Sequence, residues 1–164
     1  MFQKGKKSSS RTGGLSIMIV GCGKVGKTLV ERLSKEGHDI SVVDKSAVRL
    51  QSVTNMHDVF GVVGNGASFT VLKEAGIEHT DILIAVTDSD ELNLLCCLVA
   101  KRSGNCDVIA RVRTPDYSEE KAYLKEKLGL AMMINPEQEA ANAISRILYM
   151  PTALDVAPFA RGHA

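Results

Sequence analysis

Residues 16–26 read SIMIVGCGKVG, and this stretch decides the fold of the 164-residue chain. Its opening part, residues 16–20, is a short apolar run that is typical of a buried strand. Gly21, Gly23 and Gly26 follow with the spacing G-x-G-x-x-G, and a helical pattern starts inside the glycine loop. The N-terminus of a helix attracts phosphate because it offers unpaired N–H groups and a positive dipole end. The stretch therefore predicts a strand, a glycine turn and a helix that together hold a phosphate group.

The rest of the chain repeats this alternation of strand and helix with short connections. Apolar or β-branched runs predict the strands, and apolar residues three or four positions apart predict the helices. The predicted strands cover residues 16–20, 40–43, 59–63, 82–86, 108–112 and 131–134. The predicted helices cover residues 24–36, 46–54, 68–75, 88–102, 117–128 and 136–148. Strict alternation with right-handed crossovers predicts an α/β fold, a Rossmann-like doubly wound parallel sheet of about six strands in the order 3-2-1-4-5-6.

An acidic residue, Asp44, directly follows the second predicted strand, 18 positions after Gly26. A carboxylate at this place accepts hydrogen bonds from both hydroxyls of an adenosine ribose. Its negative charge repels a 2′-phosphate, so NAD(H), ATP, ADP or AMP is favoured over NADP. The bland alternative is a glycine turn beside a solvated aspartate, which the full fingerprint disfavours.

Further candidate residues follow the other strands that meet at the same edge of the sheet. Lys24 lies inside the glycine loop, where it either reaches a ligand phosphate or is simply solvated. Residues 64–67 follow the third strand and Thr87 follows the fourth, at the switch point where open α/β sheets bind ligands. The complete set predicted to bind the nucleotide is Gly21, Cys22, Gly23, Lys24, Val25, Gly26, Asp44, Lys45, Gly64, Asn65, Gly66, Ala67 and Thr87.

Several polar residues near this edge are interpreted as structural. Ser68 and Asp88 are predicted to cap the helices that they precede, and Asp88 forms a capping-box pattern with Glu91. Arg111 and Arg113 alternate at the fifth strand, and the favoured interpretation is that they pair with acidic residues instead of reaching the ligand.

Composition excludes several classes of function. The chain is 45% hydrophobic and 24% charged, as expected for a soluble globular domain, and its net charge is +1. This balance gives no general reason to bind nucleic acid or a membrane surface. No segment approaches the length of a membrane span. The four cysteines have neither metal-ligand spacing nor a disulfide pattern, so a reducing compartment is expected.

The pattern divides the chain into three parts. Residues 1–14 are expected to be a disordered leader or tag, 15–150 the nucleotide-binding domain, and 151–164 a linker that opens a missing C-terminal lobe. A hydride-transferring enzyme needs a substrate domain with an acid or base beside the nicotinamide. The sequence therefore predicts no enzymatic activity, and the alternative is a dehydrogenase fragment.

Two motifs are more specific than the fingerprint. They are AVTDSDE at residues 85–91 and GNGAS at residues 64–68, which is soon followed by VLKEAG. Together with INPEQEAANAI at residues 134–144, they make the chain resemble the RCK/KTN family, the TrkA-N-type regulatory domains of potassium channels and Trk/Ktr-type transporters. The resemblance covers about residues 16–148.

The resemblance implies a cytoplasmic, nucleotide-sensing regulator that gates ion flux and lies at the inner membrane through a transporter subunit. It also implies a C-terminal crossover helix that pairs subunits into a homodimer or larger ring. In the predicted last helix, Ala140, Ala141, Ile144, Ile147 and Leu148 form one stripe, which suits either this role or packing on its own sheet. By the same resemblance, Lys24 reaches phosphate across the interface and Glu137 binds a divalent cation. A regulatory domain of a cation/proton efflux system remains an alternative.

Overall fold

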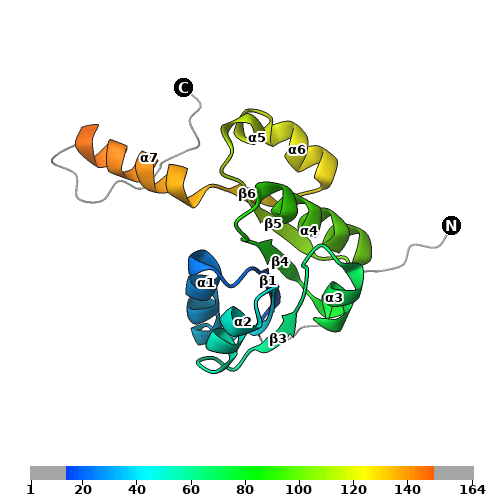
Figure 1. The fold of residues 1–164 in the computed structure, drawn as a ribbon. Coiled ribbons are helices and arrows are strands. Elements are labelled where there is room, and N and C mark those ends of the chain that lie inside the picture. Colours follow the sequence, from blue (N-terminus) through cyan, green and yellow to red (C-terminus); the bar gives the residue numbers. More distant parts are fainter. Residues whose placement is uncertain (1–13, 150–164) are drawn as a thin grey trace.

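The computed structural model describes residues 14–149, so the predictions for residues 1–13 and 150–164 lie outside the described residues. The strands are β1 (Ser16–Val20), β2 (Asp39–Asp44), β3 (Phe60–Val63), β4 (Ile82–Ala85), β5 (Asp107–Arg111) and β6 (Met132–Ile134). All pairings are parallel, and the order is β3-β2-β1-β4-β5-β6. The predicted doubly wound sheet is confirmed (Figure 1).

Helices cover both faces of this sheet. They are α1 (Lys24–Lys35), α2 (Ala47–Thr54), α3 (Phe69–Glu74), the 3-10 helix η1 (Ile77–His79), α4 (Asp90–Ser103), α5 (Pro115–Glu119), α6 (Lys121–Leu128) and α7 (Pro136–Tyr149). α1 and α2 pack on one face, and α3, α4 and α6 pack on the other (Figure 1). None of the helices within residues 14–149 is long and apolar enough to cross a bilayer.

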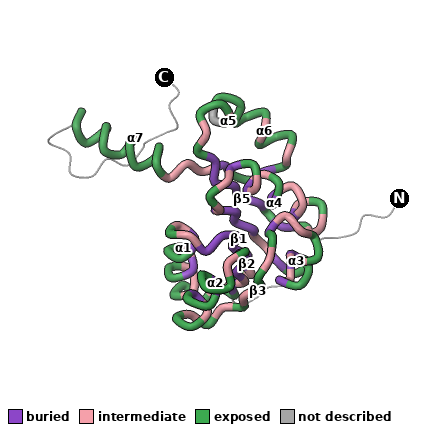
Figure 2. The backbone as a smooth tube through the Cα atoms, in the orientation of Figure 1, coloured by how far each residue is buried: buried purple, intermediate pink, exposed green. Residues whose placement is uncertain are grey.

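The central strand explains why the first run of the sequence is apolar at every position. Ile17 and Ile19 of β1 contact the core beneath α1 and α2, whereas Met18 and Val20 contact the core beneath α3 and α4. All four side chains are buried, since a parallel strand covered on both faces has no polar side (Figure 2). The glycine loop is therefore anchored on the most buried strand of the domain.

Two details of the helices differ from the sequence prediction. α4 begins at Asp90, and its cap is Ser89, whose Oγ accepts a hydrogen bond from the Leu92 N–H at 3.1 Å. The prediction that Asp88 caps this helix is therefore wrong by one residue. Ser68 does hold the cap position of α3, although its side chain makes no capping hydrogen bond.

The predicted helix over residues 117–128 is also wrong, because it forms as two shorter helices. Pro115 opens α5 earlier than the apolar pattern suggests, since its fixed φ suits a first helical turn. Glu120 has φ −93° and ψ 15°, which leaves the helical region, and α6 starts at the next residue. The two helices replace the single one without changing the order of the sheet.

The last helix, α7, projects away from the sheet (Figures 1 and 2). Its start is as predicted, because Asn135 Oδ1 accepts a hydrogen bond from the Gln138 N–H at 3.0 Å. None of its residues is buried, and Ile144, Ile147 and Leu148 are 59%, 50% and 75% exposed. The interpretation that its apolar stripe packs on its own sheet is therefore wrong.

Candidate functional site

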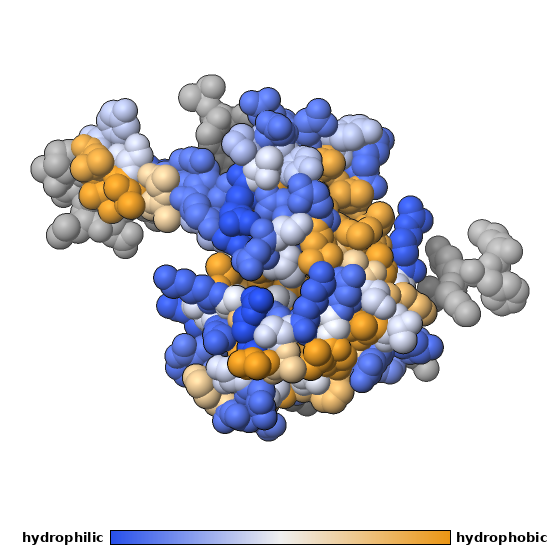
Figure 3. Space-filling model, in the orientation of Figure 1, coloured by the Kyte–Doolittle hydropathy of each residue, from blue (hydrophilic) through white to orange (hydrophobic). Residues whose placement is uncertain are grey.

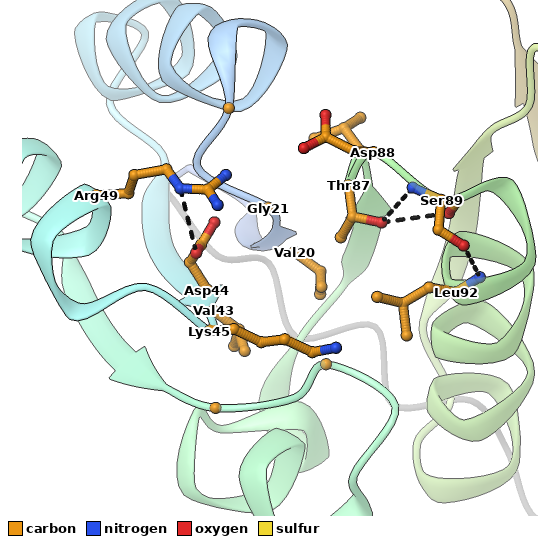
Figure 4. A pocket seen from close by; sticks show the side chains of 14 residues that line it. Val20, Gly21, Val43, Asp44, Lys45, Arg49, Thr87, Asp88, Ser89 and Leu92 are labelled. Atoms are coloured by element: carbon orange, nitrogen blue, oxygen red, sulfur yellow. Dashed lines mark hydrogen bonds and ion pairs between the residues drawn. The ribbon is translucent and has the colours of Figure 1, made fainter.

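A cavity opens at the carboxyl ends of β1, β2 and β4, where the strand order reverses direction (Figure 4). This is the place where open α/β sheets bind ligands. The residues that line it come from the glycine loop, from β2 and α2, from the turn after β3 and from the segment that joins β4 to α4. They are Val20, Gly21, Gly23, Val43, Asp44, Lys45, Arg49, Gly64, Gly66, Val86, Thr87, Asp88, Ser89 and Leu92.

The three glycines of the loop serve different purposes. Gly21 has φ +108°, and a Cβ there would lie 2.9 Å from the Thr87 nitrogen. A Cβ on Gly26 would lie 1.8 Å from the Gly21 carbonyl oxygen, so these two glycines are required by the protein's own packing. Gly23 lines the cavity at the start of α1, and a Cβ there would meet nothing within 4 Å. The space beside Gly23 therefore fits a ligand phosphate at the helix N-terminus.

Asp44 forms the opposite wall and is 7% exposed. Its Oδ2 accepts a hydrogen bond from the Cys22 N–H at 2.6 Å, and its Oδ1 accepts one from the Ser46 N–H at 2.7 Å. Each carboxylate oxygen keeps a second lone pair that is able to accept a ribose hydroxyl. Asp44 thus ties the glycine loop to the start of α2 while it remains on the cavity wall.

Two cations lie beside this carboxylate. Arg49 lies in the first turn of α2, and its Nε atom is 4.0 Å from Asp44 Oδ1, with the side chain half-exposed. Lys45 follows Asp44 and extends along the lower side of the cavity (Figure 4). The β2 side of the cavity therefore carries both signs of charge, which suits a ligand with hydroxyl groups and an anionic chain.

The turn after β3 forms a further wall of the cavity through Gly64 and Gly66. A Cβ on Gly66 would lie 2.2 Å from Val20 Cγ1, so this turn packs directly on the end of β1. Asn65 Oδ1 accepts a hydrogen bond from the Ala67 N–H at 3.2 Å, which shapes the turn, and neither of these two residues lines the cavity.

Thr87, at the end of β4, is held by a buried amide. Asn93 Oδ1 accepts hydrogen bonds from the Thr87 N–H at 2.8 Å and from the Thr87 hydroxyl at 2.7 Å. Asn93 is 0% exposed, and its Nδ2 donates to the Thr87 carbonyl at 3.3 Å and the Arg111 carbonyl at 2.9 Å. The Arg111 side chain in turn donates to the carboxylate of Glu137, in the first turn of α7. This network links the cavity to the last helix.

The arginine pairings agree with the structural interpretation of the two arginines. Arg111 pairs with Glu137, and Arg113 Nε lies 3.7 Å from Asp90 Oδ1. A hydrogen bond from its own backbone N–H to the carboxylate, followed by the pairing with Arg111, lowers the pKa of Glu137. Within residues 14–149, no cluster of three or more His, Cys, Asp or Glu side chains is placed to hold a metal ion. Cation binding by Glu137 stays a prediction.

The cavity gathers part of the predicted set. The predicted residues that line it are Gly21, Gly23, Asp44, Lys45, Gly64, Gly66 and Thr87. The predicted residues that do not line it are Cys22, Lys24, Val25, Gly26, Asn65 and Ala67. Cys22, Val25, Gly26, Asn65 and Ala67 belong to the glycine loop, the first turn of α1 and the turn after β3, but they do not face the cavity. Lys24 is exposed at the start of α1. The lining residues that the sequence analysis missed are Val20, Val43, Arg49, Val86, Asp88, Ser89 and Leu92.

Two buried cysteines, Cys22 and Cys96, lie near the cavity and have unreactive thiols. Burial, together with the charge of Asp44, raises the pKa of Cys22 to about 11, so its thiol stays protonated at neutral pH. Burial likewise raises the pKa of Cys96 to about 12. Both residues act as small apolar side chains in the core, as free buried cysteines usually do.

Known proteins resemble this chain in sequence and in fold. Residues 17–136 match the model of the TrkA-N domain. The chain is 40% identical over 150 residues to the Trk system potassium uptake protein TrkA of Halomonas elongata, covering 90% of this chain and 33% of that protein. It therefore spans about a third of the length of this relative.

Solved structures agree with the family match. The TrkA-N domain of the inner membrane protein ybaL from Escherichia coli superposes with a TM-score of 0.72 at 25% identity, covering 82% of this chain and 97% of that one. The GsuK channel bound to NAD has the same fold, with a TM-score of 0.63 at 23% identity over 76% of this chain and 22% of that one. The family model covers most of the described residues, and the chain therefore belongs to the TrkA-N domain family.

Proposed function

We propose that this domain binds an adenine nucleotide, either NAD(H) or ATP, ADP or AMP, and acts as a nucleotide-sensing regulator of a potassium-uptake system without catalysing a reaction. The observation that carries the proposal is the open space at Gly23, at the N-terminus of α1 and across from Asp44. Gly21, Gly23 and the start of α1 would hold the phosphates, and Asp44 the adenosine ribose.

The family match supports regulation over the two alternatives. The relative at 40% identity is a component of a Trk potassium-uptake system, which favours potassium uptake over cation/proton efflux. It also disfavours the dehydrogenase fragment. In this proposal the domain works at the cytoplasmic face of the membrane, and nucleotide contacts that differ between two arrangements of subunits change the flux through a membrane partner.

Replacing Asp44 with alanine is expected to weaken the binding of NAD and AMP about tenfold to a hundredfold. Hydrogen bonds to a charged acceptor contribute about 1.5–3 kcal/mol, and 1.4 kcal/mol corresponds to a factor of ten. Isothermal titration measures the change. Asp39→Ala is the matched control, because Asp39 is an exposed aspartate at the other end of the same strand. A wild-type domain that binds none of NAD, NADH, ATP, ADP and AMP would refute the proposal.

We further propose that α7 pairs two copies of the chain. Ile109, Met132 and Ile134 lie on the same face of β5 and β6, and all three remain at least partly exposed. Helices α4 and α6 cover the opposite face of these two strands. The apolar stripe of α7, visible at its free end in Figure 3, matches this uncovered face in character. Exchange of α7 between two subunits would cover both surfaces in a closed dimer.

Ile147→Asp is expected to convert a dimer into a monomer, because it places a charge in the middle of the apolar stripe of α7. Sedimentation velocity or light scattering reports the change in mass. Asn142→Asp adds the same charge on the opposite side of the helix, and it should leave the dimer intact. A wild-type chain that is monomeric at micromolar concentration would contradict the pairing.

A further inference from the structure

A second carboxylate faces the cavity from the side opposite Asp44. Asp88 follows β4, and its side chain is turned across the cavity toward Arg49 (Figure 4). Among residues 14–149, its carboxylate has no hydrogen-bond or ion-pair partner, although its carbonyl oxygen accepts a hydrogen bond from Arg113 at 2.5 Å. The helix cap next to it is Ser89, so capping does not account for the acid at this position.

The strand order determines which part of a nucleotide meets Asp88. β1, with the glycine loop, lies between β2 and β4. A nucleotide with its ribose at Asp44 and its phosphates at Gly23 therefore presents to Asp88 whatever group follows the phosphates. In AMP nothing follows. In ATP the remaining phosphates follow, and in NAD a second ribose follows.

The free carboxylate of Asp88 interacts differently with the phosphates of ATP and with the second ribose of NAD. A carboxylate accepts hydrogen bonds and cannot donate one, so it binds ribose hydroxyls and repels phosphate oxygens. Lys45 and Arg49 line the cavity on the β2 side. On the β4 side the guanidinium of Arg113 already donates to the Asp88 carbonyl and pairs with Asp90, so its charge is engaged by the protein itself. The distal end of the cavity is thus built for a neutral, hydroxyl-bearing group.

A second hollow continues from the cavity beyond Asp88. It shares Asp88 and Ser89 with the cavity, and it is also lined by Asp90, Glu91, Arg113 and Thr114. Its lining is polar, and the Oδ1 atom of the 4%-exposed Asp90 accepts no hydrogen bond. Arg113 Nε, at 3.7 Å, is beyond hydrogen-bonding distance from that oxygen. That oxygen is buried beyond the reach of a ligand, so it is the surface side chains of the hollow, such as the exposed Glu91, that extend the polar lining for a ligand longer than a mononucleotide.

We infer that Asp88 sets the ligand class of this domain by favouring a dinucleotide such as NAD over a nucleoside triphosphate. The inference rests on the proposed function, because it assumes that an adenine nucleotide occupies the cavity. It adds to that function a residue that discriminates between the ligands by charge.

The test compares wild-type protein with Asp88→Asn in titrations with NAD, ATP and AMP, at low ionic strength and with EDTA to remove divalent cations. We expect the wild type to bind NAD more tightly than ATP. The substitution should strengthen ATP binding by about tenfold, weaken NAD binding several-fold and leave AMP binding unchanged. Asp39→Asn, at the far end of β2, removes the same charge from outside the site and should change none of the three affinities.

The outcomes distinguish failure of the nucleotide-binding function from failure of Asp88 as the discriminating residue. If the wild type binds AMP but Asp88→Asn leaves the NAD-to-ATP ratio unchanged, Asp88 is not the discriminating residue and the proposed function stands. A wild-type preference for ATP would overturn the inference in the same way. If none of the three nucleotides binds, the proposed function fails and the inference fails with it.

Discussion

Gly26→Ala is expected to lower the free energy of unfolding by about 3 kcal/mol and to abolish nucleotide binding. The new Cβ would lie 1.8 Å from the Gly21 carbonyl oxygen, and backbone atoms have little freedom to give way. Overpacking usually costs about 1–3 kcal/mol, and a clash with backbone belongs at the upper end of that range. Either α1 moves away from β1 or the turn at Gly21 changes, and both responses destroy the phosphate cradle. Urea unfolding and titration with NAD measure the two effects.

Gly23→Ala is the matched control for this prediction. Gly23 has φ −70° and ψ −168°, which alanine adopts readily, and its Cβ would meet no atom of the chain within 4 Å. Stability should therefore stay within about 0.5 kcal/mol of the wild type, as for a surface substitution. Nucleotide affinity should still fall at least tenfold. A Gly23→Ala protein that binds NAD normally would show that the open space at this glycine is not where the ligand approaches.

Asp90→Ala is expected to be the second most damaging substitution, with a loss of about 3 kcal/mol in the free energy of unfolding. Asp90 Oδ2 accepts hydrogen bonds from the Arg113 N–H at 2.8 Å, the Thr114 N–H at 2.7 Å and the Thr114 hydroxyl at 2.7 Å. This carboxylate joins the first turn of α4 to the segment after β5, and its removal leaves these donors without their acceptor. Asp88→Ala, next to the same turn, is the control and should change stability little.

The stabilisation by Asp90 should depend on pH. Burial opposes its ionisation, yet the hydrogen bonds from Thr114 and Arg113 and the Arg113 charge outweigh burial and hold the pKa of the carboxyl below its ordinary value. Because the pKa is lower in the folded state, the contribution is complete above the ordinary aspartate pKa and is lost as the pH falls through the folded value. The stability difference between wild type and Asp90→Ala should therefore shrink in acid. A difference that stays constant down to pH 2 would contradict this account.

The fold was predictable because its signals are local and repeated. Each strand is an apolar run bounded by a glycine or polar turn, and the strand order follows from the handedness of the crossovers. The errors arise where neighbouring residues compete for one role. Asp88 and Ser89 are both good helix caps, and only the path of the chain after β4 decides that Ser89 takes this position.

The cavity was predictable where a short sequence pattern fixes the place of a residue at the end of a strand. Gly21, Gly23 and Asp44 were found because the fingerprint fixes their spacing. Arg49 was missed because its place in the cavity depends on how α2 turns after β2, which no short pattern encodes. Leu92 was missed for a related reason, since it belongs to the first turn of α4 and enters the cavity wall through tertiary packing alone.

The buried amide of Asn93 connects Thr87, at the edge of the cavity, to the first turn of α7 through a chain of hydrogen bonds. A shift of Thr87 would stretch its hydrogen bonds to Asn93. Asn93 in turn donates to the Arg111 carbonyl, and the Arg111 side chain donates to Glu137. A ligand that displaces Thr87 would therefore either break these hydrogen bonds or pass the displacement on to Glu137, in the first turn of α7. Because α7 projects from the sheet, a change in its direction at Glu137 would move the far end of the helix more than its first turn.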